Sequence, residues 1–505
     1  MKKFNFNFGR FLLFLQFFIL FGAFIALVVF LVYNIDYKYV YLGVASVYLL
    51  NTIFVLIVYS QQRPTGAKLS WIYVFIIFPF FGHLMFLVFG LVFRNSNEEH
   101  ISKEPQFDLN SYVENQTIEN QHRYPKTLSY LETLDNNYSL PGNIKLFNEG
   151  YEFYLDLFKE LKEAKESIFI VSYIIKNSEI FDSLFKIIKQ KLDEGVKIKW
   201  ILDDFGVMYS PKRKIKKLKS KGLEYKILGK IYYPFINAKS FSRNHEKLFI
   251  IDSKTVYTGG NNISDEYDSL AKKYGHWVDI NYKLDGPIIN KYNLHFAKFW
   301  KIVSGENIIA KANDFCKNYE NLNNYKNDLI QVTDSPNLSY STAEYYWIKM
   351  ISNAKKEIKI ATPYFAISEA LKTAIILALK SNVKITIYFP GLPDKKLIHK
   401  ISLSQLGKLQ KLGLEIKIYQ EVFMHSKMGL VDGKVAWIGS NNMDNRSLYS
   451  QYETMDILAG EALKEIESVF NFYDQKTTNL KDVPNLNYKW NKFEKFLFDW
   501  MKPLI

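Results

Sequence analysis

Three long apolar runs dominate the first hundred residues of the chain. They cover residues 11–35, 39–62 and 69–93, and none contains Asp, Glu, Lys or Arg. Each has about 24 or 25 residues, and a helix of that length extends roughly 36 Å, enough to cross a bilayer core. No polar face recurs at helical spacing, which argues against buried helices of a soluble domain. We therefore expect residues 1–100 to form a membrane anchor with two or three hydrophobic segments.

The flanking charges and the third run bear on how the anchor crosses the membrane. The first run is too long for the apolar region of a cleaved signal peptide, so we interpret it as a retained anchor. Pro79 and Gly82 interrupt the third run, which predicts either a kinked crossing or a re-entrant segment. A full crossing would place the rest of the chain outside, whereas a re-entrant segment would keep it in the cytoplasm. Basic residues that favour the cytoplasmic side precede the first run and follow the second: Lys2, Lys3, Arg10, Arg63 and Lys68. We expect a multi-pass protein of a cell membrane, with the rest of the chain on the cytoplasmic face.

From residue 101 onward, apolar helices alternate with short β-branched strands. Residues 153–175 show the pattern of a helix followed by a strand, and residues 183–206 repeat it. Such alternation is typical of an α/β architecture.

The same scheme returns in the second half of the chain. Residues 343–365 parallel the first helix–strand unit, and GLEIKIY at 413–419 parallels GLEYKIL at 222–228. A tandem duplication accounts for both correspondences. The polar, Asn-rich stretch 320–329 is the predicted linker, which gives two domains at 101–319 and 320–505.

One short motif occurs once in each predicted domain. HEKLFIID at 245–252 is followed six residues later by GGNN, and HSKMGLVD at 425–432 is followed at the same distance by GSNN. The shared pattern is H-x-K-x4-D-x6-G-[GS]-x-N, and its two copies lie at identical internal spacing. Its polar members are His245, Lys247, Asp252 and Asn262 in the first copy, and His425, Lys427, Asp432 and Asn442 in the second.

The motif has a chemical rationale. Residues two apart in a strand point to one face, so each histidine emerges beside its lysine, while each aspartate has the opposite parity and suits a supporting role in the catalytic set. The small residues before the last asparagine allow a close turn, so its amide can join the lysine at an anion. Two such halves suit a tetrahedral phosphorus, with lysines and asparagines on its oxygens. One imidazole would attack phosphorus, and the other would protonate the leaving oxygen and then deprotonate an incoming alcohol. This chemistry needs no metal or cofactor, and each lysine disfavours a cation beside its histidine.

Composition narrows the class of partner. Lys and Arg number 65 against 51 Asp and Glu, a net charge of +14 that favours nucleic acid or an acidic membrane surface. The single cysteine, Cys316, excludes an internal disulfide framework and a multi-cysteine metal site. The basic run 211–221 could attract an anionic leaflet by about 1 kcal/mol per charge, although a solvated helix face is its alternative. The apolar anchor favours lipid over nucleic acid.

These motifs resemble those of the phospholipase D superfamily, and most closely those of bacterial cardiolipin synthases. TGGNNISDEY at 258–267, GSNNMDNRSL at 439–448, HWVDINYKLDGP at 276–287, TPYF at 362–365 and FPFFG at 78–82 carry the resemblance. It implies two tandem phospholipase D-like α/β domains related by pseudo-two-fold symmetry, behind N-terminal transmembrane helices.

The resemblance also implies an activity. One phosphatidylglycerol would be attacked at phosphorus with release of glycerol, and a hydroxyl of a second would resolve the phosphohistidine, giving cardiolipin. By analogy His245 is the nucleophile and His425 the acid/base, although the halves are alike enough to reverse these roles. Family members place a carboxylate near each histidine, and Asp279 and Glu453 are the candidates here, with ordinary surface carboxylates as the alternative.

Several functions would use the same residues. A phospholipase D would pass the intermediate to water, and a phosphatidylserine-forming enzyme would use another alcohol. A nuclease fits the basic charge but not the anchor, and a non-catalytic scaffold fits poorly because all six His, Lys and Asp residues are intact. The sequence leaves open the acceptor, the acyl preference and the oligomeric state.

Overall fold

The computed structural model describes most of the chain, in two compact units. The described residues are 8–34, 36, 39–61, 63, 65–92, 95–108, 125–135, 137–232, 236–268, 275–309 and 315–483. Of the described residues, one unit contains the N-terminal helices together with the segment 229–242, and the other contains residues 95–228 and 243–483.

The N-terminal unit is helical. The first two apolar runs form the helices α1 (Phe8–Asn34) and α2 (Val40–Ser60). The third run is divided into α3 (Thr65–Ile77), α4 (Phe81–Met85) and the π-helix η2 (Phe86–Gly90). Within the described residues, one helical stretch, Tyr41–Ser60, is long and apolar enough to cross a membrane.

The interruption predicted in the third run is present, and the run reverses direction there. Phe80, next to Pro79, takes a left-handed φ of 64° and breaks the helix. A straight helix would separate Trp71 from Phe86 by roughly 22 Å, whereas their ring centroids lie 5.2 Å apart. Gly82 permits this close return, because a Cβ there would lie 2.7 Å from the Val74 carbonyl oxygen. The third run is therefore a helical hairpin and not one continuous helix.

The larger unit is built on a mixed sheet of sixteen strands within the described chain, of which fifteen follow one another in a single order and the sixteenth, β5 (Arg243–Asn244), lies off this path. From its centre outward, the first half has the order β1-β9-β7-β6-β2-β3-β4, and the second half repeats it as β10-β19-β17-β16-β11-β13-β14, ending in β20. The first-half strands are β1 (Leu140–Phe147), β2 (Ser167–Ser172), β3 (Lys197–Asp203), β4 (Glu224–Leu228), β6 (Leu248–Ile251), β7 (Thr255–Gly259) and β9 (Asn281–Asp285). The second-half strands are β10 (Asn327–Asp334), β11 (Glu357–Ala361), β13 (Lys384–Pro390), β14 (Glu415–Tyr419), β16 (Met428–Val431), β17 (Val435–Gly439), β19 (Gln451–Gly460) and β20 (Thr477–Asn479).

The two halves join through their central strands. β1 and β10 pair antiparallel, with Leu140 opposite Leu329, so the sheet continues from one half into the other. The repeated strand order confirms the duplication that the sequence predicts. The stretch 320–329, predicted as a linker, overlaps the junction between the halves, because its last three residues belong to β10, which begins at Asn327.

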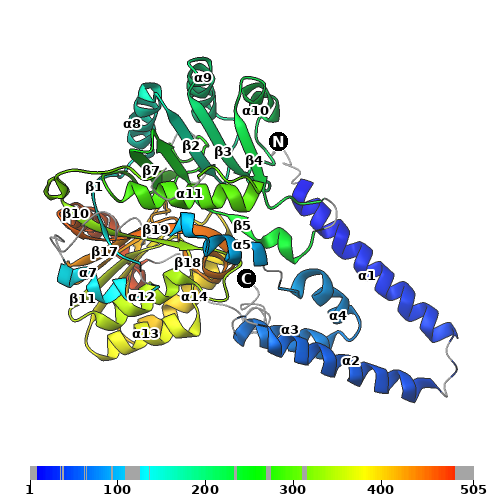
Figure 1. The fold of residues 1–505 in the computed structure, drawn as a ribbon. Coiled ribbons are helices and arrows are strands. Elements are labelled where there is room, and N and C mark those ends of the chain that lie inside the picture. Colours follow the sequence, from blue (N-terminus) through cyan, green and yellow to red (C-terminus); the bar gives the residue numbers. More distant parts are fainter. Residues whose placement is uncertain are drawn as a thin grey trace, which may run out of the picture. The chain divides into compact units, whose positions relative to one another are not determined.

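Helices cover both faces of this sheet. In the first half, α8 (Gly150–Glu163), α9 (Glu179–Asp193) and α10 (Lys212–Lys219) lie on one side of β2–β4, and α11 (Ile289–Ser304) lies on the other (Figure 1). Alternation along β2 explains this, because Ile168 and Ile170 pack with α8 and α9 whereas Phe169 stacks on Phe296 of α11. In the second half, α12 (Thr342–Asn353), α13 (Glu369–Lys380) and α14 (Lys396–Gln410) share one core, and α16 (Leu463–Lys476) packs in another.

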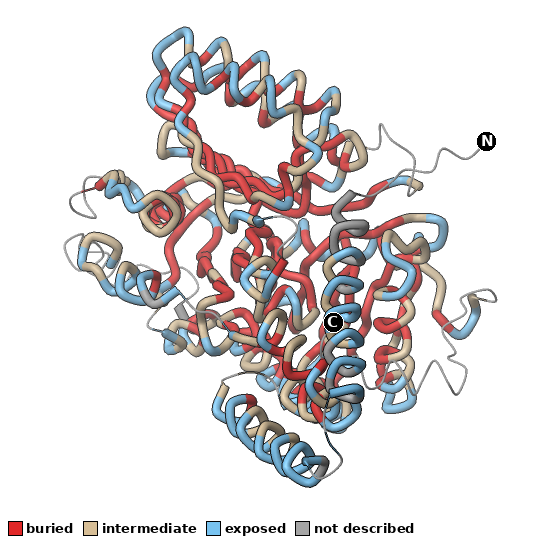
Figure 2. The backbone as a smooth tube through the Cα atoms, turned by 90° about the vertical axis from the view of Figure 1, so that its right-hand side faces the viewer, coloured by how far each residue is buried: buried red, intermediate tan, exposed pale blue. Residues whose placement is uncertain are grey.

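The hydrophobic core on the α11 side of the sheet spans both halves. α11 and α16 contribute Tyr292, Phe296, Phe470 and Tyr473 to a single buried cluster that includes strands of both halves. Buried positions follow the strands, and exposed positions follow the outer sides of the helices (Figure 2). The basic run 211–221 forms α10, which buries Ile215 and Leu218 and exposes most of its cations.

Candidate active site

Each motif histidine lies just before a central strand of its own half and is held by the opposite half. His245 follows β5 (Arg243–Asn244), which pairs with β19 of the second half. His425 follows β15 (Val422–Met424), which pairs with β8 (His276–Val278) of the first half. The strands β6 and β16 begin only after the lysines, so the expectation that the histidine and lysine belong to the strand is wrong by three residues. The crossed pairing brings both motifs to the boundary between the halves.

The carboxylates that contact the histidines are crossed in the same way. His245 Nδ1 lies 3.0 Å from Glu453 Oε2, and the His245 amide donates to the Tyr452 carbonyl at 2.8 Å. His425 Nδ1 lies 2.5 Å from Asp279 Oδ2, and its amide donates to the Val278 carbonyl at 2.6 Å. The sequence suggested a carboxylate near each histidine, and the structure pairs each one with the histidine of the other half. An Nδ1 engaged in this way leaves Nε2 of each ring for chemistry.

The two carboxylates differ in their surroundings. Burial raises the pKa of Glu453 to about 8, against the opposing effects of Lys247 and of the Ser440 and Ser447 hydroxyls, which donate to it at 2.5 Å each. Burial also acts to raise the pKa of Asp279, but the charges of Lys427 and His425 outweigh it and lower that pKa. The carboxylate beside His425 is thus more firmly ionised than the one beside His245.

The two lysines are buried in the same cluster. Lys247 and Lys427 each donate to the carbonyl of the histidine two residues earlier, and Lys427 Nζ lies 3.8 Å from Asp279 Oδ1. Burial lowers the pKa of Lys247 to about 7 and also lowers that of Lys427. Burial and the nearby lysines push the pKa of His245 well below its ordinary value and that of His425 to about 4. An anion bound beside these lysines and imidazoles would raise their pKa values again, because a nearby negative charge favours the protonated forms.

The motif aspartates lie at the other end of the strands. Asp252 accepts the backbone N–H groups of residues 165–167 at 2.7–2.9 Å, and Asp432 does the same for residues 355–357. Four residues of strand lie between each aspartate and its lysine, so five steps of the strand separate the two by roughly 16 Å. Both aspartates take left-handed φ angles near 50° in the turn that follows the strand. The geometry places them outside the histidine cluster, in the supporting position that their parity suggests.

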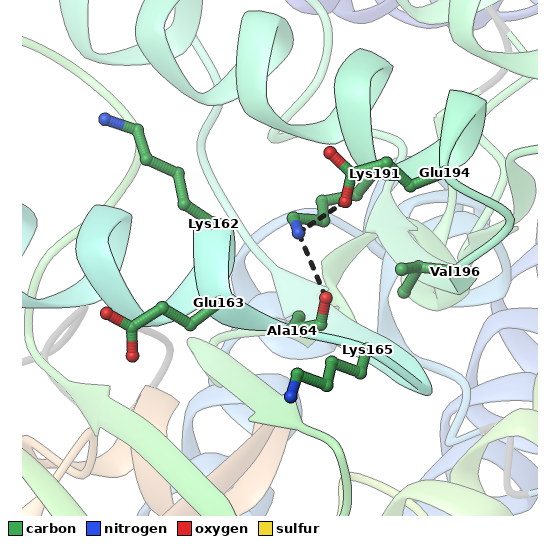
Figure 3. Close-up of a pocket in the computed structure, with 7 residues that line it drawn as sticks. All are labelled: Lys162, Glu163, Ala164, Lys165, Lys191, Glu194 and Val196. Atoms are coloured by element: carbon green, nitrogen blue, oxygen red, sulfur yellow. Dashed lines mark hydrogen bonds and ion pairs between the residues drawn. The ribbon is translucent and has the colours of Figure 1, made fainter.

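A cavity of about 620 Å³ opens at this far end, and its chemistry differs from that of the histidine cluster. Its one buried cation, Lys191, points back into the protein and donates to the Ala164 carbonyl at 3.0 Å and to Glu194 at 2.6 Å (Figure 3). The lining residues are Lys162, Glu163, Ala164, Lys165, Lys191, Glu194 and Val196. None of them belongs to the motifs, so this cavity adds nothing to the candidate site.

The two motif asparagines are used differently. Asn262 accepts the Ile174 N–H at 3.1 Å and donates to the Tyr267 hydroxyl at 2.6 Å, so both ends of its amide hold the first half together. Contact of this amide with a phosphate stays a prediction. The side-chain oxygen of Asn442 is buried and has no partner in the described part of the chain.

The structure adds residues that the sequence does not single out. The Tyr173 ring lies 5.4 Å from the His245 ring, and the Trp277 and Phe423 rings lie 5.1 and 5.7 Å from the His425 ring. These aromatic walls flank both imidazoles. Ser440 and Ser447 could have been suspected, since both stand in the GSNNMDNRSL segment, but no periodicity marks the aromatic residues.

Comparison with known proteins identifies the family that carries this arrangement. The family model described as cardiolipin synthase, PLD-like domain, matches twice, at residues 157–300 and 347–472. The chain belongs to this phospholipase D-like family. A second model, described as phospholipase D-nuclease N-terminal, matches residues 49–90, which include the C-terminal half of α2 and the helical hairpin.

Relatives cover nearly the whole chain. A cardiolipin synthase of Oceanobacillus iheyensis is 29% identical over 84% of this chain and 90% of its own length. One of Staphylococcus aureus is 26% identical over 94% of this chain and 98% of its own length. A crystal structure of phosphatidylserine synthase from Haemophilus influenzae has the same fold, with a TM-score of 0.58 at 15% identity over 75% of this chain and 98% of that one. The cardiolipin synthase homologues and the two PLD-like domains support a phosphatidyltransferase of the cardiolipin synthase type.

Proposed function

We propose that this enzyme is a membrane-bound cardiolipin synthase. It transfers the phosphatidyl group of one phosphatidylglycerol to a glycerol hydroxyl of a second, giving cardiolipin and glycerol through a phosphohistidine. The names of the relatives support the overall reaction, and the crossed histidine–carboxylate pairs support the two-step route. The halves act as a pseudo-symmetric pair, with domain boundaries near residues 101, 320 and 505.

In the first step, Nε2 of His245 attacks phosphorus and the bond from phosphorus to the glycerol oxygen breaks. Glu453 holds the Nδ1 side of that ring, and Nε2 of His425 gives its proton to the leaving oxygen. Burial and the lysines lower the pKa of His425 in the substrate-free site. The phosphodiester anion opposes this effect, because a negative charge nearby favours the imidazolium.

In the second step, the glycerol hydroxyl of another phosphatidylglycerol loses its proton to His425 and attacks phosphorus. The nitrogen–phosphorus bond breaks, and His245 is restored. The ammonium groups of Lys247 and Lys427 stabilise the charge that builds on the non-bridging oxygens, with Asn442 as an amide donor. Asn262, Asp252 and Asp432 support the loops that carry these groups.

The observation that carries transfer rather than hydrolysis is the burial of the four reacting side chains. His245 and His425 expose 8% and 5% of their surface, and Lys247 and Lys427 expose 4% and 2%. Side chains this buried contact little bulk water, which favours a bound lipid hydroxyl over water in resolving the intermediate. Hydrolysis to phosphatidic acid would use the same residues and is the second outcome of the test below.

We further propose that the anchor is multi-pass and that α10 faces an anionic membrane surface on the cytoplasmic side. Six of the eight residues of α10 are cationic, and it has no acidic residue in its first turn. Acidic groups in the first turn would stabilise the helix through its dipole, so the cations there make the helix less stable while they make its exposed face positive. Each charge adds about 1 kcal/mol near an anionic leaflet.

Phosphatidylglycerol as the sole lipid substrate tests the proposal. The purified full-length protein in detergent–lipid micelles should yield cardiolipin and glycerol in equal amounts, as resolved by mass spectrometry. His245→Ala and His425→Ala should each abolish both products. Phosphatidic acid without cardiolipin would replace the proposal with hydrolysis, and full activity in either variant would exclude the two-histidine site.

A further inference from the structure

A buried carboxylate follows the anchor directly in sequence. The post-anchor segment, residues 95–108, belongs to the larger unit and contains α5 (Ser96–Ser102). Glu98 on α5 exposes only 7% of its surface, unlike its neighbour Glu99, whose side chain is 72% exposed. A carboxylate this buried needs specific partners, since desolvation of an unpaired charge is costly.

The partners of Glu98 lie more than two hundred residues away in sequence. Its Oε2 accepts the Tyr452 hydroxyl at 2.7 Å and the side-chain amide of Asn337 at 2.5 Å. The same Asn337 amide donates to the Tyr452 oxygen at 2.9 Å, and its carbonyl accepts the Asn95 N–H at 2.7 Å. These bonds form a closed polar network between the post-anchor segment and β19.

Tyr452 connects this network to the candidate catalytic histidine. Its carbonyl accepts the His245 N–H at 2.8 Å, and the next residue, Glu453, contacts His245 Nδ1 at 3.0 Å. The Tyr452 ring packs on Phe299 of α11, with centroids 4.9 Å apart. One short stretch of β19 thus holds both the backbone of His245, through the Tyr452 carbonyl, and its imidazole, through Glu453. Glu98 holds the Tyr452 side chain of that stretch.

A second buried network joins the first motif to α11. Glu246, between the first histidine and lysine, is fully buried and lies 2.9 Å from His295 Nε2. Burial lowers the pKa of Lys298, while Glu98 and Glu246 act in the opposite direction. The post-anchor segment also docks on α11 through Lys301 and Glu104, whose charged atoms lie 2.5 Å apart.

Within the described residues, the second histidine has no equivalent of this support. The residue that presents a carbonyl to the His425 amide is Val278, which has no polar side chain and precedes Asp279 as Tyr452 precedes Glu453. In the second motif, Ser426 takes the place of Glu246, and its hydroxyl lies 2.7 Å from the Tyr473 hydroxyl of α16. The connection to the post-anchor segment is therefore particular to His245.

We propose that Glu98 is a positioning residue for His245. Its carboxylate fixes the Tyr452 side chain, which holds the Tyr452 carbonyl and the Glu453 carboxylate against the histidine. Phosphatidyl transfer therefore depends on docking of the segment that emerges from the membrane anchor. The activity readout of this inference rests on the proposed function.

Full-length variants test this connection by a double-mutant cycle. Glu98→Ala and Tyr452→Phe should each lower kcat roughly tenfold with KM unchanged, because a small displacement of a reacting group is enough to cost that much. The double variant should lose no more than the larger single loss, since both changes break one connection. Glu99→Ala is the matched control on the same helix and should retain wild-type kcat. Tyr452→Phe keeps the ring contact with Phe299, so it tests the connection even if Glu98→Ala fails to fold.

Hydrogen exchange gives a readout that does not depend on activity. The His245 amide should exchange faster in Glu98→Ala and Tyr452→Phe, whereas the His425 amide should be unaffected in both. A folded Tyr452→Phe variant with unchanged kcat and unchanged exchange at His245 would overturn the inference, as would losses that multiply in the double variant. If the wild-type protein makes no cardiolipin, the proposed function fails while the exchange experiment still decides the connection.

Discussion

Replacing Asp279 by asparagine removes one negative charge from the cluster and little else. The side chain is buried, its Oδ2 lies 2.5 Å from His425 Nδ1, and its Oδ1 lies 3.8 Å from Lys427 Nζ. An amide has nearly the same shape, so packing is preserved. What is lost is the carboxylate that stabilises the imidazolium of His425, the proposed acid of the first step.

The magnitude follows from the distances. Two unit charges about 4 Å apart interact by about 4 kcal/mol at an effective dielectric constant of 20, and breaking one partner out of a buried ion pair costs about 3–5 kcal/mol. The phosphodiester of the substrate supplies part of the missing charge, which leaves about 3 kcal/mol. Since 1.36 kcal/mol corresponds to a tenfold change, kcat should fall by roughly a hundredfold.

The assay compares two leaving groups. With phosphatidylglycerol, Asp279→Asn should show the hundredfold loss in kcat, because the glycerol oxygen must be protonated as it leaves. With a phosphatidyl ester of p-nitrophenol, whose anion leaves unaided, the first step should recover nearly to the wild-type rate. A kcat on phosphatidylglycerol within about fivefold of wild type would refute the reasoning. Equal losses on both substrates would also refute it, since the defect would then not concern protonation.

Three further outcomes follow from the same geometry. Glu453→Gln should lose less kcat than Asp279→Asn at neutral pH, because a pKa of about 8 leaves Glu453 largely protonated there and glutamine resembles that form; a larger loss would contradict this. Asp432→Asn should lower the free energy of unfolding by about 2 kcal/mol, because its bonds to three backbone amides become weaker, and should leave kcat unchanged. Asp252→Asn should give the same two results in denaturation and kinetic measurements. A loss of kcat without a loss of stability in either variant would point to a direct role in the reaction. The pKa of His425, about 4 in the folded protein against the ordinary 6.5, means that the unfolded state takes up its proton first. Stability from this group is therefore complete above about pH 6.5 and declines as the pH falls towards about 4, by about 3 kcal/mol at most; thermal unfolding of His425→Gln should show a shallower decline than wild type, and an identical profile would contradict the shift.

The sequence predicts the repeated fold and the identity of the motif residues because both depend on local sequence patterns. Strand and helix periods recur at matching positions, and the two motifs keep identical spacing. The supporting place of Asp252 could also be inferred, since parity along a strand is a local property.

Contacts across the halves could not be predicted in the same way. Asp279 stands closer in sequence to His245, yet it contacts His425, because β8 and β15 pair across the boundary between the halves. Nothing in the local pattern around Asn262 shows that its amide is committed to Ile174 and Tyr267. The bond between Glu98 and Tyr452 joins residues 354 apart and depends on tertiary packing alone.

The most direct test of the central claim, a two-step transfer through one histidine with the other as acid/base, is a burst experiment with the p-nitrophenol ester in single-histidine variants. His425→Ala should release one equivalent of p-nitrophenol per enzyme and then stop, because the first step needs no acid and the second lacks its base. Mass spectrometry should then find the phosphatidyl group on His245, and His245→Ala should show no burst. A burst in His245→Ala but not in His425→Ala would reverse the assigned roles, and wild-type turnover without a burst in either variant would contradict the covalent route.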